Sequence, residues 1–310
     1  MASQVLFRLI GGVALWIASC GGIAAGGFTF GAFGDTPYTW FEEAHFPALV
    51  AEMNKEDLSF VVHVGDFRGG DLPCSDELFL QRKRWFNSIR HPFIFVPGDN
   101  EWKDCRSPRA GGYDPLERLG KLRELFFQGE LSLGQRRIRL ERQPGSYPEH
   151  ARWRHESVLF ASLNVPGHDN NALHMPEEFR SRSAVVDQWL EQSFALARQD
   201  SLRAVVILMQ ANPWFGGTAS DIGFRDLLRR LAAESRAFDG EVLLVHGDTH
   251  RYRVDQPLRD PATGTPVTNF TRVEVFGSHN INWVRIRVSE QGENVQFEAT
   301  QGSWEVEKKD

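Results

Sequence analysis

Residues 58–66 read LSFVVHVGD, a run of apolar residues that ends in Gly65-Asp66. Three other segments repeat the pattern, FTFGAFGD at 28–35, PFIFVPGD at 92–99 and EVLLVHGD at 241–248. Apolar runs of this length, rich in Val, Ile and Phe, predict buried strands. Glycine permits a backbone bend at each strand end, and aspartate leaves a carboxylate there. Because four carboxylates at neighbouring strand ends would repel one another, the pattern predicts a bound cation and therefore a metal site.

The order of the remaining elements indicates two packed sheets. Apolar residues with helical spacing lie between the strand-like runs, at 46–53, 186–197 and 224–231. Beyond His250 come three strand-like segments, at 267–276, 281–288 and 294–300, which we expect to form an antiparallel meander that completes the second sheet. We therefore expect an α/β fold, with helices outside two sheets, and one domain over residues 28–310.

Composition narrows the class of protein. The 310 residues are 41% hydrophobic, enough for a full core, and the formal net charge is -6. Since no basic tract stands out, we expect no nucleic-acid partner. No Gly-x-Gly-x-x-Gly turn follows any predicted strand, which argues against a Rossmann-type nucleotide binder.

Residues 1–27 have the features of an export signal. Arg8 precedes a Gly- and Ala-rich apolar stretch, 9–25, that is too short and too rich in glycine for a membrane span. The segment IASC at 17–20 also resembles a lipoprotein signal, in which Cys20 would be lipidated. Lipoprotein, cleaved soluble export and an uncleaved anchor all stay open. Each places the chain in the periplasm or cell envelope, with membrane contact only through the N-terminus.

The cysteines fit that location. Of the 3 cysteines, Cys74 and Cys105 lie outside the signal, each a few residues beyond a Gly-Asp strand end. An even pair in an oxidising compartment predicts a disulfide between the two loops. The alternative is two unpaired loop thiols.

The Gly-Asp strand ends, PGDNE at 97–101 and HGDTH at 246–250 together resemble the motif order of the calcineurin-like metallophosphoesterase superfamily, over residues 28–288. The resemblance implies a four-layer α/β/β/α sandwich of two mixed sheets flanked by helices. It also implies two divalent metal ions at the carboxyl ends of strands and hydrolysis of phosphoester bonds by a metal-bound hydroxide. By motif position it assigns Asp35, Asp66 and His250 as ligands of one metal ion, and Asp66 (bridging both ions), Asp99, Gln210 and Asp248 as ligands of the second.

The chain departs from the family pattern at four positions expected to hold histidine, which carry Pro37, Asn100, Gln210 and Asp248. The remaining donors are mostly oxygen, which favours Mn²⁺ or Mg²⁺ over Zn²⁺ or Fe. Asn100 takes the place of the family histidine that assists the leaving group. An amide can hydrogen-bond a phosphate but cannot act as an acid.

Several neighbouring residues have open roles. Arg68 follows Asp66 and either contacts phosphate or is a solvated loop arginine. Tyr38 either lines a substrate pocket or caps its loop, and His168 could approach the site and replace the missing acid. His246 and His63 are interpreted as buried structural histidines.

Two functions follow from these features. We expect a metal-dependent hydrolase of phosphomonoester, phosphodiester or phosphoanhydride bonds, acting on a phosphorylated small molecule or lipid. The alternative, which the missing histidines favour, is a catalytically degenerate protein of the same fold that serves as a cell-envelope binding or interaction module.

Overall fold

The computed structural model describes residues 26–302 except 216–217 and 293, and without the side chains of 218–221. The predicted export signal and Cys20 lie outside this part of the chain, apart from Gly26 and Gly27, which begin the first strand. No helix among the described residues combines the length and the apolar character needed to cross a membrane.

The strands form two mixed sheets. The five-stranded sheet has the order β12-β11-β1-β2-β3 and consists of β1 (Gly26–Phe33), β2 (Val61–His63), β3 (Phe93–Phe95), β11 (Val284–Gln291) and β12 (Asn294–Gln301). The seven-stranded sheet has the order β4-β5-β6-β7-β8-β10-β9 and consists of β4 (Glu141–Arg142), β5 (Ala151–His155), β6 (Val158–Ser162), β7 (Ala204–Leu208), β8 (Glu241–His246), β9 (Arg253–Asp255) and β10 (Phe270–Glu274).

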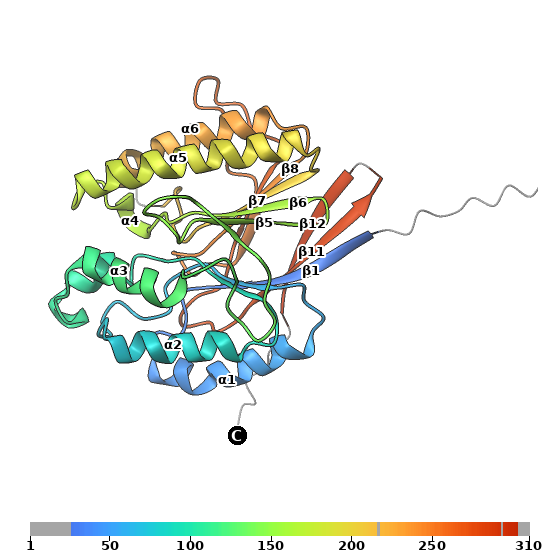
Figure 1. Ribbon diagram of the computed structural model, residues 1–310. Coiled ribbons are helices and arrows are strands. Elements are labelled where there is room, and N and C mark those ends of the chain that lie inside the picture. The colour runs from blue at the N-terminus through green and yellow to red at the C-terminus, as the bar shows by residue number, and fades with distance from the viewer. Residues whose placement is uncertain (1–25, 216–217, 293, 303–310) are drawn as a thin grey trace, which may run out of the picture.

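Helices cover the outer face of each sheet (Figure 1). The five-stranded sheet packs against α1 (Trp40–Lys55), α2 (Asp76–Ser88) and α3 (Pro115–Phe126). The seven-stranded sheet packs against α5 (Pro176–Gln199) and α6 (Thr218–Arg236). Short helical turns lie in the loops between them: α4 (Gly167–Asn170) and the 3₁₀ turns η1 (Lys103–Arg106) and η2 (Pro108–Ala110).

The hydrophobic core divides along the alternating faces of the strands. In β2, Val62 packs into the layer between the sheets, whereas Val61 packs toward the helices. In β6, Phe160 faces the other sheet and Leu159 faces the α5 side. Successive side chains of a strand point to opposite faces, so strands that are apolar throughout are buried on both sides. The predicted α/β/β/α sandwich is therefore confirmed.

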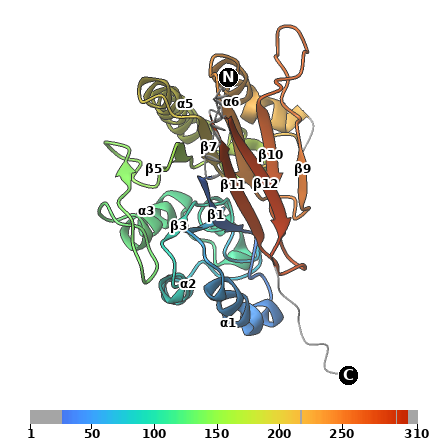
Figure 2. The same cartoon turned by 90° about the vertical axis from the view of Figure 1, so that its right-hand side faces the viewer.

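The predicted C-terminal meander is wrong in its sheet assignment. β10 pairs in parallel with β8 and antiparallel with β9 in the seven-stranded sheet, whereas β11 and β12 extend the five-stranded sheet beside β1 (Figure 2). An apolar pattern specifies that a segment is a strand, but the partner is chosen by long-range packing. The tail therefore completes both sheets.

The parallel strands bring the site loops to one edge. β1, β2 and β3 run parallel in a register that aligns Ala32, Val62 and Ile94, and β7 runs parallel to β8. Their carboxyl ends consequently point the same way. The backbone N–H of Asp248, after β8, donates to both carboxylate oxygens of Asp35, after β1, at 3.1 and 3.0 Å. The two sheets thus meet at this edge.

Candidate metal centre

The turns after the strands hold four candidate site residues in the left-handed backbone region. The φ angles are 51° at Asp35, 59° at Asp66, 84° at Asp248 and 59° at His250. This region is costly for residues other than glycine and is found preferentially at functional sites. The bends aim the side chains away from their strands and toward a common centre.

Glycines next to the aspartates make room for carboxylates from other loops. A Cβ atom on Gly98 would lie 2.0 Å from Oδ1 of Asp66, and one on Gly247 would lie 2.0 Å from Oδ2 of Asp35. Both distances are far inside van der Waals contact, so only glycine fits. Each of these glycines therefore supports the aspartate of a different motif.

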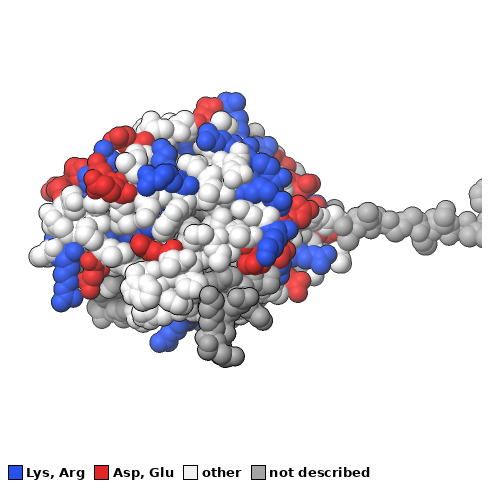
Figure 3. Space-filling model, turned by 90° about the horizontal axis from the view of Figure 1, so that it is seen from below, with Lys and Arg blue, Asp and Glu red and all other residues white. Residues whose placement is uncertain are grey.

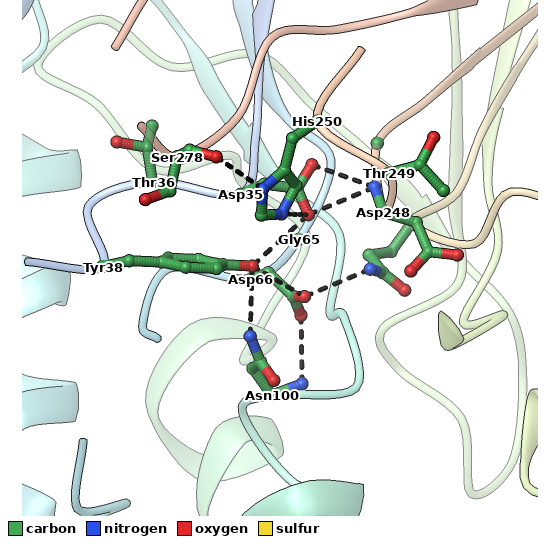
Figure 4. A network of polar contacts seen from close by, with 12 residues as sticks. Asp35, Thr36, Tyr38, Gly65, Asp66, Asn100, Asp248, Thr249, His250 and Ser278 are labelled. Atoms are coloured by element: carbon green, nitrogen blue, oxygen red, sulfur yellow. Dashed lines mark hydrogen bonds and ion pairs between the residues drawn. The ribbon is translucent and has the colours of Figure 1, made fainter. Parts of the chain in front are cut away.

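Four residues, which we call the Asp35 cluster, lie around one point: Asp35, Tyr38, Asp66 and His250 (Figure 4). The Tyr38 hydroxyl lies 3.0 Å from Oδ2 of Asp66 and 3.5 Å from Oδ1 of Asp35. Nε2 of His250 lies 3.7 Å from the same Asp35 oxygen. Tyr38 is thus a central member of the site and not only a loop cap.

The hydrogen bond on the far side of His250 fixes its tautomer. Nδ1 lies 2.6 Å from the backbone oxygen of Ser278, which can only accept, so Nδ1 carries the hydrogen. Nε2 then presents its lone pair toward Asp35. This is the arrangement of metal-ligating histidines, whose second nitrogen donates to a carbonyl or carboxylate.

A second group, the Asp99 cluster, contains Asp99, Lys103, His168 and Asp248. Nζ of Lys103 lies 3.5 Å from Oδ2 of Asp99, and Nδ1 of His168 lies 3.5 Å from the same oxygen. Gly167 lies against both Asp99 and Asp248, because a Cβ on this glycine would be 3.1 Å from Oδ1 of Asp99 and 2.6 Å from Oδ1 of Asp248. An approach of His168 to the site was considered from the sequence, whereas Lys103 was not predicted.

The two amides at histidine positions act as hydrogen-bond donors. Nδ2 of Asn100 donates to the Tyr38 hydroxyl at 3.1 Å and to the backbone oxygen of Arg68 at 2.9 Å, while the Asn100 N–H donates to Asp66 at 3.0 Å. Nε2 of Gln210 donates to Oδ2 of Asp66 at 3.2 Å. Oε1 of Gln210 is buried without a hydrogen-bond partner in the described residues, which leaves one acceptor available to a cation.

Arg68 is buried, and its guanidinium binds backbone carbonyls. Nε donates to the backbone oxygen of Leu72 at 2.9 Å, and Nη2 donates to that of Gly70 at 2.9 Å. Nη1 donates to the backbone oxygen of Asn100. These contacts hold the loop that follows Asp66. A contact between Arg68 and phosphate stays a prediction, and it would require some of these bonds to break.

The predicted disulfide is confirmed. Cys74 and Cys105 are joined, with 5.7 Å between their Cα atoms. Their sulfur atoms lie 3.6 and 3.5 Å from the backbone oxygen of Asn100. The crosslink therefore supports the loop that carries Asn100 and Lys103.

Electrostatics in the cluster favour an added positive charge. Burial, reinforced by Asp248, raises the pKa of Asp35 well above its usual value, and burial with Asp99 nearby does the same for Asp66. Burial, again with Asp99, raises the pKa of Asp248 to about 7. Asp99 is the exception: despite its burial, the hydrogen bond from His168 and the charge of Lys103 lower its pKa. Clustered carboxylates with raised pKa values are what a cation stabilises.

The donor chemistry fits a cation in the Asp35 cluster. Among the described residues, no three His, Cys, Asp or Glu side chains come together as closely as an assembled metal site requires. With the Tyr38 oxygen included, however, neighbouring donor atoms are separated by 3.0 to 3.7 Å. Donors that share an ion at about 2.1 Å lie about 3.0–3.5 Å apart, so small side-chain movements would suffice. The residues of this cluster fit a cation; the Asp99 cluster already contains one charged amine.

The two-sheet sandwich, with aspartates at its strand ends, agrees with the metallophosphoesterase fold that the sequence predicts. Residues 28–252 match the family model of the calcineurin-like phosphoesterases, and the chain belongs to this family. Members of the family generally use a dinuclear metal centre.

Solved structures show the same fold. The purple acid phosphatase PPD1 from yellow lupin (Lupinus luteus) seeds superposes with a TM-score of 0.55 and 12% identity, over 90% of this chain and 52% of that chain. PhoD superposes with a TM-score of 0.51 and 11% identity, over 91% of this chain and 73% of the PhoD chain. This chain thus spans about half the length of the lupin phosphatase. No curated protein sequence matches the chain.

Proposed function

We propose that the chain hydrolyses phosphoester bonds with the help of a divalent cation held by the Asp35 cluster. The observation that carries the proposal is the convergence of the Tyr38 hydroxyl and Nε2 of His250 on Oδ1 of Asp35, with Asp66 beside the same hydroxyl and the lone pair of Nε2 facing the cluster. Membership of the calcineurin-like phosphoesterase family supports the reaction type.

The residues of the site would have different roles in the reaction. When bound, a divalent cation neutralises charge that grows on the phosphoryl oxygens and supplies a hydroxide nucleophile near neutral pH. Asp35, Asp66, Tyr38 and His250 would hold it. Asn100 cannot donate a catalytic proton, and its amide is already bonded to Tyr38. Substrates with good leaving groups, such as phosphoanhydrides and aryl esters, are therefore favoured.

A pocket of about 260 Å³ opens beside the site and would receive the substrate. It is lined by His168, Phe215, Asp248, Thr249, His250 and Arg251. Its size suits the phosphate of a small molecule or a lipid headgroup, with Arg251 available to the anion. We expect no nucleic-acid partner, because the net charge is -6 and basic and acidic side chains are interspersed on the face seen in Figure 3.

We propose Mn²⁺ or Mg²⁺ as the metal, in preference to Zn²⁺ or Fe. Three of the four donors of the Asp35 cluster are oxygens, as is the unpartnered buried Oε1 of Gln210. Oxygen-rich sites favour hard cations. Stoichiometric Zn and Fe in gently purified protein would contradict this choice.

The decisive experiment is a metal-by-substrate activity screen of the purified protein, with Asp66→Asn as the inactive control. We expect hydrolysis of an aryl phosphate or a phosphoanhydride that depends on added Mn²⁺ or Mg²⁺ and falls by at least about 10²-fold in the variant. Activity that survives chelation, or that is equal in Asp66→Asn, would refute the proposal.

One observation favours the alternative, a binding or interaction module without catalysis. The hydroxyl of Tyr38 and the amides of Asn100 and Gln210 form hydrogen bonds with Asp66, or with one another, so protein groups already stabilise this carboxylate. The same screen decides between the two functions. No activity with any metal, together with no heat of metal binding, would establish the binding module.

We also propose that the protein is exported to the periplasm or cell envelope, and that Cys20 is a candidate for lipidation. The signal-like residues 1–27 support this, as does the Cys74–Cys105 disulfide, since disulfides are typical of oxidising compartments. Cell fractionation, with fatty-acid labelling of wild type and Cys20→Ala, tests both. Membrane release by the substitution indicates a lipid anchor, whereas unchanged location excludes it.

A further inference from the structure

A buried amine stands where the resemblance places ligands of a second metal. The Lys103 side chain is only 3% exposed. Its Nζ donates to the backbone oxygen of Gly167 at 3.1 Å and lies 3.5 Å from Asp99 and 3.7 Å from Asp169. A lysine so deeply buried is found almost only where its charge is paired. Here one ammonium lies between two carboxylates that are themselves 4% exposed.

Protein donors also contact carboxylate oxygens at this position. Both oxygens of Asp66 accept hydrogen bonds, one from the Asn100 N–H at 3.0 Å and one from Gln210 at 3.2 Å. Oδ2 of Asp248 accepts from the Asn212 N–H at 2.9 Å. The main obstacle to a second ion is at Asp99, whose Oδ2 is paired with the Lys103 ammonium.

The backbone of Gly167 also lies against both carboxylates. Gly167 approaches both Asp99 and Asp248 so closely that a Cβ would lie 3.1 and 2.6 Å from their oxygens. Its carbonyl is at the same time an acceptor for Lys103. The loop and the lysine therefore take up part of the space around Asp99 and Asp248.

We propose that this site binds one divalent cation, in the Asp35 cluster, and that the Lys103 ammonium takes the place of the second ion. The proposal rests on the function proposed above and narrows it to a mononuclear site. A divalent ion beside Lys103 would face a like charge in a poorly solvated position, which is strongly unfavourable. One cation and one fixed amine would together offset part of the charge of the four aspartates.

Metal stoichiometry tests the proposal without reference to activity. Metal-free protein is titrated with Mn²⁺ by calorimetry, and the loaded protein is examined by EPR. We expect one Mn²⁺ per chain and the spectrum of an isolated, uncoupled ion. Two Mn²⁺ per chain, with an exchange-coupled spectrum, would overturn the proposal.

Variants at Lys103 test its part in the site. Lys103→Met removes the charge but keeps the length, and we expect it to bind a second Mn²⁺. Lys103→Arg keeps the charge, and we expect it to bind one ion as wild type does. Lys55→Met is the matched control, because Lys55 is 69% exposed and pairs only with Glu52 in the contacts described. A folded Lys103→Met that still binds one ion with unchanged affinity would contradict the assignment of Lys103.

The outcomes separate this inference from the proposed function. One ion without hydrolysis of any substrate leaves the inference standing and refutes the hydrolase. Two ions per chain, together with hydrolysis, would refute the inference of a single ion and support the proposed hydrolase. No binding of Mn²⁺ or Mg²⁺ by wild type contradicts both. If Lys103→Met does not fold, the wild-type stoichiometry and EPR spectrum still decide.

Discussion

The Tyr38 hydroxyl lies 3.0 Å from Oδ2 of Asp66, across a gap of 28 residues in the sequence. The same hydroxyl lies 3.5 Å from Asp35 and accepts a hydrogen bond from Asn100. A side chain outside the family's predicted ligand set therefore links the two carboxylates on which the metal site depends.

Replacing Tyr38 with Phe should weaken Mn²⁺ binding by about 10–100-fold, the range seen when groups that orient or complete a metal site are lost. The ring can keep its edge contact with His250, whose centroid lies 5.2 Å away, so the fold should be retained. Calorimetry gives the affinity and thermal unfolding the stability. Tyr147→Phe, on a loop beside His150, is the control. Equal Mn²⁺ affinities for wild type and Tyr38→Phe would show that the Tyr38 hydroxyl does not contribute to cation binding.

His168→Ala should lower kcat, and more for substrates with poor leaving groups than for aryl phosphates. The side chain is 77% exposed, lines the pocket and lies 3.5 Å from Asp99, so it is placed to reach a leaving group. A positioned acid typically contributes about 10²–10⁴-fold. The measurement is kcat against leaving-group pKa, with His174→Ala as control because His174 is exposed beside Asp169. An unchanged slope for His168→Ala excludes this role.

Arg68→Met should destabilise the fold without changing KM. Three carbonyls lose their donor, and unsatisfied buried groups cost about 1–3 kcal/mol each before relaxation. We expect a loss of about 2–4 kcal/mol in the free energy of unfolding, measured by urea denaturation. Arg109→Met, an exposed residue paired with Asp71, should change it by less than about 0.5 kcal/mol. A raised KM with unchanged stability would instead support the predicted contact with phosphate.

Removal of the disulfide, by Cys74→Ala with Cys105→Ala, should lower the free energy of unfolding by about 3–4 kcal/mol. The two cysteines are 31 residues apart, and closing a loop of this length restricts the unfolded chain by that amount. Because the bond supports the loop that carries Asn100, which donates to Asp66 and Tyr38, binding of the cation in the Asp35 cluster should weaken as well. Denaturation of wild type with and without reductant is the parallel measurement. Equal stabilities would show that the crosslink adds nothing.

Three buried histidines that are neutral in the fold should each lower the stability as the pH drops below about 6.5, in opposition to Asp35, Asp66 and Asp248, whose raised pKa values favour the folded state over the same range. Burial lowers the pKa of His63 and His246 to about 3 and that of His150 to about 4. In His63 both ring nitrogens are engaged, since the Gly65 N–H donates to Nδ1 and Nε2 faces the Thr36 oxygen. Protonation would break the bond from Gly65.

The sign follows from proton linkage. An unfolded histidine titrates near pH 6.5, so between that value and the folded pKa the unfolded state binds more protons. Each histidine therefore removes up to about 1.4 kcal/mol per pH unit as the pH falls through this window. Urea denaturation at about pH 7.5, 6 and 5 measures the slope. In His150→Gln the free energy of unfolding should fall less steeply with decreasing pH than in wild type. An unchanged slope in that variant would contradict the lowered pKa of His150.

The local elements could be predicted because their signals are local. The apolar stripes at 46–53 and 186–197 mark helix faces that are buried in the structure, and the Gly-Asp pairs mark the strand ends. The sheet to which β10 and β11 belong could not be predicted, because both segments alternate in the same way and only long-range pairing separates them.

The sequence pattern indicated the carboxylates of the candidate site, but it did not indicate the buried positive charge of Lys103 beside them. Asp35 and Asp66 follow strands that pair in parallel, and the packing of the two sheets brings Asp248 beside Asp35. Lys103, by contrast, lies in a short 3₁₀ turn after the PGDNE motif, where neither periodicity nor spacing shows which way a side chain points. Its burial is decided by Gly167 and Asp169, more than sixty residues away, and no pattern near Lys103 reports them.

The glycines of the Gly-Asp pairs have a consequence for how this site can be altered. Because Gly98 accommodates Asp66 and Gly247 accommodates Asp35, each two-letter motif is completed by a partner on another strand. Alanine at Gly98 would displace the Asp66 carboxylate and so imitate a substitution of Asp66. In a double-mutant cycle the two changes should be strongly non-additive. The glycine of one motif and the aspartate of another thus work as a pair at this edge of the sheets. A substitution in one motif therefore displaces the carboxylate of another.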